Sequence, residues 1–177
     1  MKNLLPDPVP GFDQPIAVLK HCHDRIRKQL NTLHKLLTHL PVSGTDLDAK
    51  QAANAVMKYF NQAAGNHHAD EEQDLLPMLQ ATARGDDAAL LHALLPDILR
   101  EHGEMEALWQ ALDRQLHEIA SGTSAQLSAD DVARFSALYL AHMKKEESHI
   151  APMAKRLFSD AQMAQLGDAM RARRNVQ

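Results

Sequence analysis

Four long segments of this sequence repeat apolar side chains at intervals of three and four residues, the spacing of one face of an α-helix. In the first segment, residues 15–40, the apolar positions are Ile16, Leu19, Ile26, Leu30, Leu33, Leu37 and Leu40. The same spacing recurs in residues 46–79, 98–119 and 132–153. Four amphipathic helices with short connections predict an all-α fold, the up-down four-helix bundle.

The predicted bundle covers residues 15–157, between an irregular N-terminal extension and a short C-terminal helix with its tail. Prolines and a lack of periodicity mark the extension, residues 1–14. Asp13 predicts the N-cap of the first helix, because Pro15 suits the first helical turn that follows. The C-terminal helix and tail occupy residues 158–177, and their basic RARR stretch is expected to be a solvated helix end.

Proline and glycine predict a break between the second and third long helices. The ATARGDD stretch, residues 81–87, is typical of a loop, and a short helical stretch follows in residues 88–95. Pro96 is expected to kink the chain or to restart a helix, because it has no backbone N–H. Farther along, Ser159 and Gln162 have the spacing of a capping box at the start of the last helix.

Polar side chains occupy positions on the apolar faces where the spacing calls for apolar ones. These residues are His23, His67, Glu71, His102, His142 and Glu146. Burying a lone carboxylate is unfavourable, and buried charges in proteins are normally paired or bound to a metal. The polar residues also fall near one level of the bundle, so together they predict a cation held at that level.

A sequence repeat relates the two halves of the chain. HHADEEQDLLPM (residues 67–78) and HMKKEESHIAPM (residues 142–153) both read H-x-x-x-E-E-x-x-aliphatic-x-P-M. Each is preceded, roughly 40 residues earlier, by one histidine in an apolar face, His23 before the first and His102 before the second. The polar identities shared by the two copies favour a functional cause for the repeat.

The spacing within each repeat fits a dinuclear metal site. Residues four apart lie on one face of a helix, so His67 is expected beside Glu71, and His142 beside Glu146. Helices that direct such groups into the core of a bundle build dinuclear carboxylate sites. Carboxylate and imidazole ligands suit iron or manganese and also accommodate zinc, whereas a single cysteine argues against a thiolate zinc site.

These motifs resemble the pattern of the hemerythrin-like family, also called the HHE cation-binding domain family. That pattern has a histidine on the first helix, H-x-x-x-E-E-x-x-L-F-P on the second, E-H on the third and H-x-x-x-E-E-x-x-L-F-P on the fourth. The corresponding parts here are His23 in HCHDRI, then HHADEEQDLLP, then Glu101 with His102, then HMKKEESHIAP. The resemblance covers roughly residues 15–157.

The resemblance implies a ligand set for two iron ions, Fe2+ or Fe3+, with an oxo or hydroxo bridge between them. The implied terminal ligands are His23, His67, His102 and His142, and the implied bridging carboxylates are Glu71 and Glu146. His68 falls where some relatives have an additional ligand, so we expect it to be a seventh. A buried ion-pair network in a bundle without metal is the alternative interpretation of these residues.

The sequence does not assign a single role to several residues near the predicted ligands. The oxygen-carrying hemerythrins have two histidines on the third helix and H-x-x-x-x-D on the fourth, whereas this chain has Glu106 four residues after His102. That departure argues against reversible oxygen carriage. Glu106 and His149 lie near the apolar faces, and the sequence does not decide whether either of them is a ligand. Glu72 and Glu147 are expected either on solvated flanks or as partners that orient a histidine.

Three functions stay open at this point. The first is a non-haem di-iron module that binds oxygen or nitric oxide for sensing, storage or iron and redox homeostasis; a sensor would signal through a protein partner. The second is a di-iron enzyme, namely an oxidase, peroxidase, ferroxidase or iron-centre repair protein, for which peroxide is a further small ligand. The third is a structural helical bundle without metal.

Composition argues against several partner classes. The formal net charge is −4, so the chain has no basic excess to neutralise the phosphate backbone of a nucleic acid. The apolar runs are shorter than about 18 residues, and the first residues lack the apolar stretch of a secretory signal, so we expect neither a membrane span nor export. One cysteine fits a reducing compartment, and the expected location is the cytoplasm.

Overall fold

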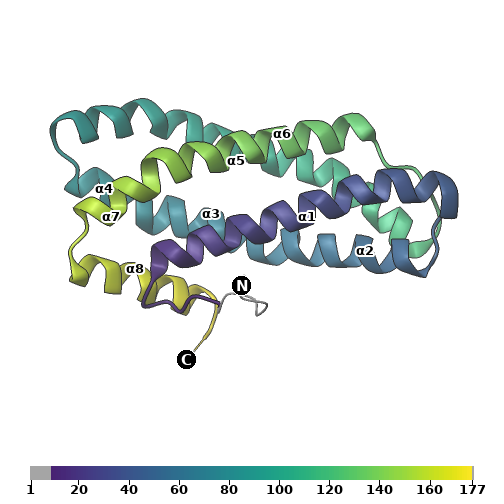
Figure 1. The fold of residues 1–177 in the computed structure, drawn as a ribbon, viewed down its shortest axis with the longest axis horizontal. Coiled ribbons are helices and arrows are strands. Elements are labelled where there is room, and N and C mark those ends of the chain that lie inside the picture. The colour runs from purple at the N-terminus through teal and green to yellow at the C-terminus, as the bar shows by residue number, and fades with distance from the viewer. Residues whose placement is uncertain (1–8, 177) are drawn as a thin grey trace, which may run out of the picture.

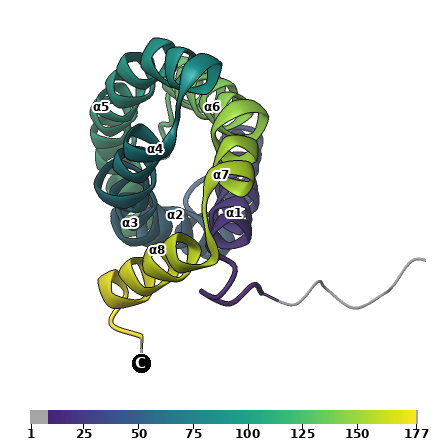
Figure 2. The same cartoon turned by 90° about the vertical axis from the view of Figure 1, so that its left-hand side faces the viewer.

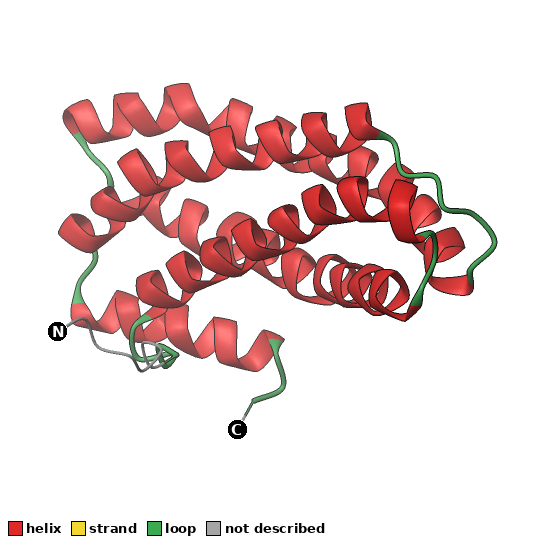
Figure 3. Cartoon of the chain, turned by 45° about the vertical axis from the view of Figure 1, so that its right-hand side comes forward, coloured by secondary structure: helices red, strands yellow, loops and turns green. Residues whose placement is uncertain are grey.

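The computed structural model describes residues 9–176, and every regular element in that range is a helix (Figure 3). The first long helix is α1 (Pro15–Ser43), and the third is α5 (Gly85–Ser121). The second comprises α2 (Leu47–Lys58), η1 (Tyr59–Ala64), α3 (Gly65–Asp70), η2 (Glu71–Leu75) and α4 (Leu76–Thr82), where η marks a π-helical segment. The fourth comprises α6 (Ala129–Lys145), η3 (Glu146–Ile150) and α7 (Ala151–Leu157), and α8 (Asp160–Arg173) follows it.

The four long helices alternate in direction around one core, and Figure 2 shows them end-on, grouped around it. Residues 44–46 and 83–84 are the connections after the first and second long helices. Connections this short leave consecutive helices side by side and antiparallel. The predicted all-α, up-down four-helix bundle is therefore confirmed. None of the described helices is both long enough and apolar enough to cross a membrane.

The core consists of two apolar clusters with a polar layer between them. Along α1, His23 separates Leu19, which belongs to one cluster, from Ile26, which belongs to the other. The same alternation on α5 places the buried His102 between the two clusters. The apolar layers on either side hold the polar residues at one level.

The predicted loop over residues 81–87 is too long, and the predicted restart of the helix at Pro96 is wrong. α5 continues through Pro96, and the loop predicted over residues 81–87 is reduced to residues 83–84. Pro96 removes one hydrogen bond from the helix. Leu91 and Ile98, on either side of it, are buried and hold both halves of α5 against the core. Tertiary packing therefore outweighs the local preference for a break.

Gln14, and not Asp13 as predicted, occupies the N-cap position of α1. The chain turns just before the helix, where the backbone N–H of Gln14 donates a hydrogen bond to the backbone carbonyl of Gly11 at 2.9 Å. No side chain caps the helix. Pro15 takes the first helical position, as predicted. The predicted extension is non-helical over its described part, and its residues 1–8 lie outside the described range.

The C-terminal helix α8 packs against one end of the bundle, beside α1 and α3 (Figure 1). Ser159 and Gln162 form the predicted capping box at its start. Near its end, the guanidinium groups of Arg173 and Arg174 both bind the carboxylate of Asp70, which is fully buried. The RARR stretch is therefore not a solvated helix end, because its last two arginines neutralise a buried carboxylate.

Candidate metal centre

Two of the π-helical segments begin at the glutamates of the sequence repeat. η2 starts at Glu71 and η3 starts at Glu146. A proline follows six residues after each glutamate, Pro77 in the first case and Pro152 in the second. A proline inside a regular α-helix clashes with the carbonyl four residues earlier, and a wider π turn relieves that clash. Both carboxylates thus lie on widened helical turns, which are frequent at functional sites.

Six buried side chains from all four long helices meet at this level and form two adjacent groups of potential metal ligands. One group is His23, His67, Glu71 and Glu146, and the other is Glu71, His102, His142 and Glu146. Within each group the ligand atoms all lie within 4.8 Å of one another. Because the groups share both glutamates, they are suited to two neighbouring cations rather than to one.

Each shared glutamate offers one oxygen to each group. Oε1 of Glu71 lies 3.2 Å from Nε2 of His67, and Oε2 of Glu71 lies 3.3 Å from Nε2 of His102. The two oxygens of Glu146 repeat this arrangement with the other two histidines, at 3.1 and 3.2 Å. Both side chains therefore span the two groups in the manner of bridging carboxylates.

Three of the four histidines are oriented by a carboxylate behind the ring. The Nδ1–carboxylate pairs are His23–Glu147 at 2.9 Å, His102–Glu72 at 2.6 Å and His142–Glu101 at 2.8 Å. An ionised carboxylate only accepts hydrogen bonds, so Nδ1 is the donor in each ring and Nε2 is the nitrogen that faces the group. Arg27 binds Glu147 and Lys145 binds Glu101, so two of these carboxylates are themselves held in place.

Several buried polar atoms of the two groups have no hydrogen-bond partner within residues 9–176. One of them is Nδ1 of His67, and the three that face the ligand positions are Nε2 of His23, Oε2 of Glu71 and Oε2 of Glu146. Buried polar atoms in native proteins are paired almost without exception, so each of these needs an explanation. Metal ions would supply the missing bonds to all three atoms, and the residues present therefore fit a dinuclear centre.

Without cations, the two shared carboxyls resist being ionised together. Burial raises the pKa of the Glu71 carboxyl well above its usual range, and the charge of Glu146 adds to that shift. Burial also opposes ionisation of Glu146, but the rings of His142 and His23 beside the carboxylate outweigh that effect and hold the pKa of Glu146 well below its usual range. In the metal-free protein, bound protons therefore supply the positive charge that metal ions would supply in the loaded protein.

Comparisons with known proteins agree with this arrangement. The model of the hemerythrin HHE cation-binding domain matches residues 14–154. The chain belongs to this hemerythrin family. It is also similar to a protein of Haemophilus influenzae described as uncharacterized, with 27% identity over 176 residues, which cover 99% of each chain. That relative extends the similarity to nearly the full length, and its description assigns no function.

Membership of the hemerythrin family and the two buried groups together indicate a metal-binding domain. Six of the residues predicted as ligands form the groups, whereas His68 belongs to neither. The His68 ring stacks on the ring of His102, with 4.0 Å between their centroids, and its Nε2 atom is buried without a partner among the described residues. Burial lowers the pKa of His68 to about 3, so the ring is neutral. Its role as a seventh ligand stays a prediction.

Two residues with open roles lie outside both groups of this hemerythrin domain. Glu106 and His149 are exposed, and neither contributes an atom to the groups. Glu106 stands where the oxygen-carrying hemerythrins have their second histidine on the third helix. In this chain the third helix therefore contributes His102 alone to the two groups.

Glu101 and Lys145 are the site residues that sequence reasoning missed. The sequence marks Glu101 only as part of the E-H motif, yet Glu101 binds His142 on the neighbouring helix. A weak signal was available, since Glu101 directly precedes His102 in the chain just as Glu72 directly follows Glu71. Each orienting carboxylate is thus the chain neighbour of a group residue but serves a histidine on another helix.

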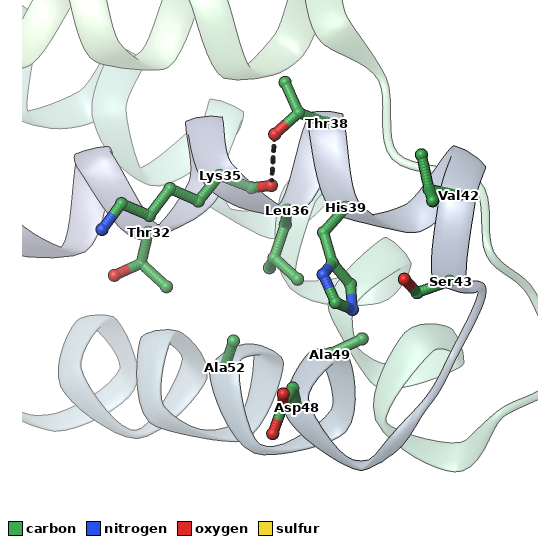
Figure 4. A pocket seen from close by; sticks show the side chains of 10 residues that line it. All are labelled: Thr32, Lys35, Leu36, Thr38, His39, Val42, Ser43, Asp48, Ala49 and Ala52. Carbon is green, nitrogen blue, oxygen red and sulfur yellow. Dashed lines mark hydrogen bonds between the residues drawn. The ribbon is translucent and has the colours of Figure 1, made fainter.

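A surface hollow of about 520 Å3 lies apart from the metal centre. It opens between α1 and α2, where Lys35, His39 and Asp48 are among its lining residues (Figure 4). His39 follows His23 by 16 residues on the same helix, which is about 24 Å at the usual rise of an α-helix. The hollow therefore does not serve the metal centre.

Proposed function

We propose that this protein binds two iron ions in a carboxylate-bridged dinuclear centre. The proposed ligands are His23 and His67 for one ion, His102 and His142 for the other, Glu71 and Glu146 as bridges, and His68 as the seventh. One observation carries the proposal. In each glutamate, one carboxylate oxygen lies within 3.3 Å of a histidine nitrogen of the first group, and the other oxygen lies within 3.3 Å of a histidine nitrogen of the second group. Manganese and zinc accept the same donor types and are the competing metals.

We infer that the centre binds oxygen or nitric oxide, for sensing, storage or iron and redox homeostasis. Two octahedral ions offer about twelve positions, of which two bridging carboxylates and five histidines fill about nine. About three positions then accept solvent or a small ligand. Bound iron supplies the redox chemistry and the affinity for these ligands, while the protein binds the ions, orients the imidazoles and excludes water. The single cysteine, Cys22, fits work in a reducing cytoplasm.

A di-iron enzyme is the second candidate, and one observation favours it. A cavity lined by His23, Glu71 and Glu146 reaches the metal groups, so a molecule larger than a diatomic gas has access to them. Optical spectra distinguish the two candidates, because a binding module returns to its starting spectrum when the ligand is removed. An enzyme instead continues to consume oxygen or peroxide, so that the amount consumed increases with time.

The dinuclear centre is tested by loading the protein with iron and measuring iron per chain together with the optical spectrum, first without air and then with it. We expect about two irons per chain. Glu71→Gln should retain at most one, because it removes a bridging oxygen, whereas Glu104→Gln on the exposed surface of α5 should retain both. Protein that takes up no iron, or a Glu71→Gln variant with its full complement, would contradict the proposal.

A further inference from the structure

A cavity of about 480 Å3 leads to the metal centre from one side of the bundle. It is bounded by α1, by η2 and by the η3–α7 part of the fourth long helix. Three residues of the metal groups, His23, Glu71 and Glu146, are buried lining residues and form its inner end. A molecule in this cavity would therefore have one end at the centre.

The two ends of the cavity differ in chemistry. Lys20 on α1 and Lys155 on α7 line it and are exposed, so they mark its mouth. The buried aliphatic lining residues between the mouth and the centre are Ile16, Leu19, Leu75 and Ile150. The cavity thus has a cationic mouth, an aliphatic middle and a metal-binding inner end.

The volume of the cavity is far greater than a diatomic gas needs. A water molecule takes about 30 Å3 of liquid, and oxygen or nitric oxide is of similar size. Sites for organic ligands span roughly 300–1,000 Å3, and 480 Å3 lies within that range. Apolar walls favour an aliphatic body over a sugar or a nucleotide, which would leave polar groups without partners.

The mouth carries positive charge that the protein does not neutralise. Glu147 also lines the cavity, but its carboxylate accepts two hydrogen bonds from Arg27, at 2.8 and 2.9 Å, and one from His23. Neither Lys20 nor Lys155 forms an ion pair within residues 9–176. Two free ammonium groups at the rim are suited to an anionic head group.

We propose that this cavity binds a monocarboxylate with a short aliphatic chain, with the carboxylate between Lys20 and Lys155 and the chain directed toward the metal centre. The opposite orientation would bring a third carboxylate to Glu71 and Glu146. The exposed mouth, in contrast, lets the head group stay partly hydrated. The proposal goes beyond metal binding, because the walls and the lysines recognise the ligand with or without metal.

The test measures the binding of butanoate, hexanoate and octanoate by calorimetry, on iron-loaded protein and on protein stripped by a chelator. Each methylene buried in the aliphatic middle should tighten binding about fourfold, the fold-change equivalent to about 0.8 kcal/mol. Each step of two methylenes in the series should then gain roughly fifteenfold. Hexanol and octanol, which have no charge, should bind more weakly than the matching acids.

Two variants locate the ligand. The double variant Lys20→Met with Lys155→Met should abolish the preference for acids over alcohols while leaving the gain per methylene in place. Ala151→Leu, which adds bulk at a half-buried wall position, should weaken octanoate more than butanoate. The matched control is Lys28→Met with Lys144→Met, two exposed lysines that do not line the cavity. Circular dichroism and iron content on each variant confirm an intact fold and centre.

Three outcomes would overturn the proposal. One is the same affinity for all three chain lengths, and a second is an unchanged acid preference in the Lys20→Met, Lys155→Met variant. The third is acid binding that requires iron and ignores both lysines, since the carboxylate would then be bound by the metal. Loss of iron binding with retained chain-length dependence would contradict the di-iron function and leave this cavity proposal standing.

Discussion

Three histidines of the centre are oriented by carboxylates that do not belong to the two groups of potential ligands. Glu101 is one of these, since it accepts a hydrogen bond from Nδ1 of His142 at 2.8 Å and one from Lys145 at 2.6 Å. Such partners set the tautomer and the direction of a ligating imidazole. A centre with intact ligands is therefore still expected to weaken when this outer carboxylate changes.

Glu101→Gln should weaken iron binding by about 10-fold to 100-fold while leaving the helix content unchanged. The amide keeps the shape of the side chain but loses the charge that stabilises the Nδ1 proton of His142. Glu104→Gln is the matched control, because that glutamate pairs with the exposed Arg100 on the same helix. Competition with a coloured chelator measures both affinities, and equal values for the two variants would refute the orienting role.

Iron binding should weaken as the pH falls and should release protons. Burial holds the pKa of Glu71 above its usual range. Burial lowers the pKa of His23 and of His142, but Glu146 outweighs it and raises both. The metal-free form thus binds more protons than the metal-bound form, and lowering the pH favours it. Calorimetry in buffers of different ionisation enthalpy counts the released protons, and an affinity that is constant on both sides of about pH 6.5 would contradict this prediction.

At the scale of the helical elements, the π turns decide where the bridging carboxylates lie. η3 contains Glu146 and ends just before α7, where Pro152 has no N–H for the carbonyl of Ser148. The wider turn accommodates the proline and rotates the preceding residues relative to a regular helix. The position of Glu146 at the centre therefore depends on a proline one and a half turns away.

Pro152→Ala should weaken iron binding by about tenfold while maintaining or raising thermal stability. The added amide can donate to the Ser148 carbonyl, which allows a regular α turn and moves Glu146. Pro96→Ala is the control, because Pro96 lies in the interior of α5 and no π segment precedes it there. Unchanged iron affinity in Pro152→Ala would mean that the proline does not maintain the π turn.

For the molecule as a whole, the C-terminal helix is joined to the bundle through a buried charge. Asp70 is fully buried next to Glu71, and both of its oxygens are bound by arginines that follow it by more than 100 residues, Arg173 and Arg174. Docking of α8 thus neutralises the buried carboxylate of Asp70. The end of α8 is thus bound to the residue that directly precedes Glu71.

Asp70→Asn should lower the free energy of unfolding by about 3 kcal/mol, because it leaves two arginines without their partner. For a chain of this size, that loss corresponds to a fall of about 6–12 °C in Tm. Asp168→Asn, which breaks an exposed pair with Arg171, should change stability by less than about 1 kcal/mol. Urea unfolding of metal-free protein measures both variants, and faster amide exchange confined to α8 is expected in the first. Equal stability of the two would refute the docking role.

Much of the fold and most of the centre follow from local patterns. His67 and Glu71 lie four residues apart in an apolar face, and the same holds for His142 and Glu146, so their shared direction is a property of one helix. The order of helices and the short connections then bring these pairs to one level. His68 shows the limit of local reasoning, because one step around the helix moves its ring from the groups to the side of His102.

The sequence by itself determined the four long helices, their order and most of the residues that face the core, since the period of an α-helix is a local property. Only the tertiary structure decided the continuity of α5 across Pro96, the pairing of Glu101 with His142 over 41 residues and the pairing of Asp70 with Arg174 over 104 residues. These features depend on free energy that is gained only when distant helices pack and remove charges from water, and no local pattern records which helices will meet.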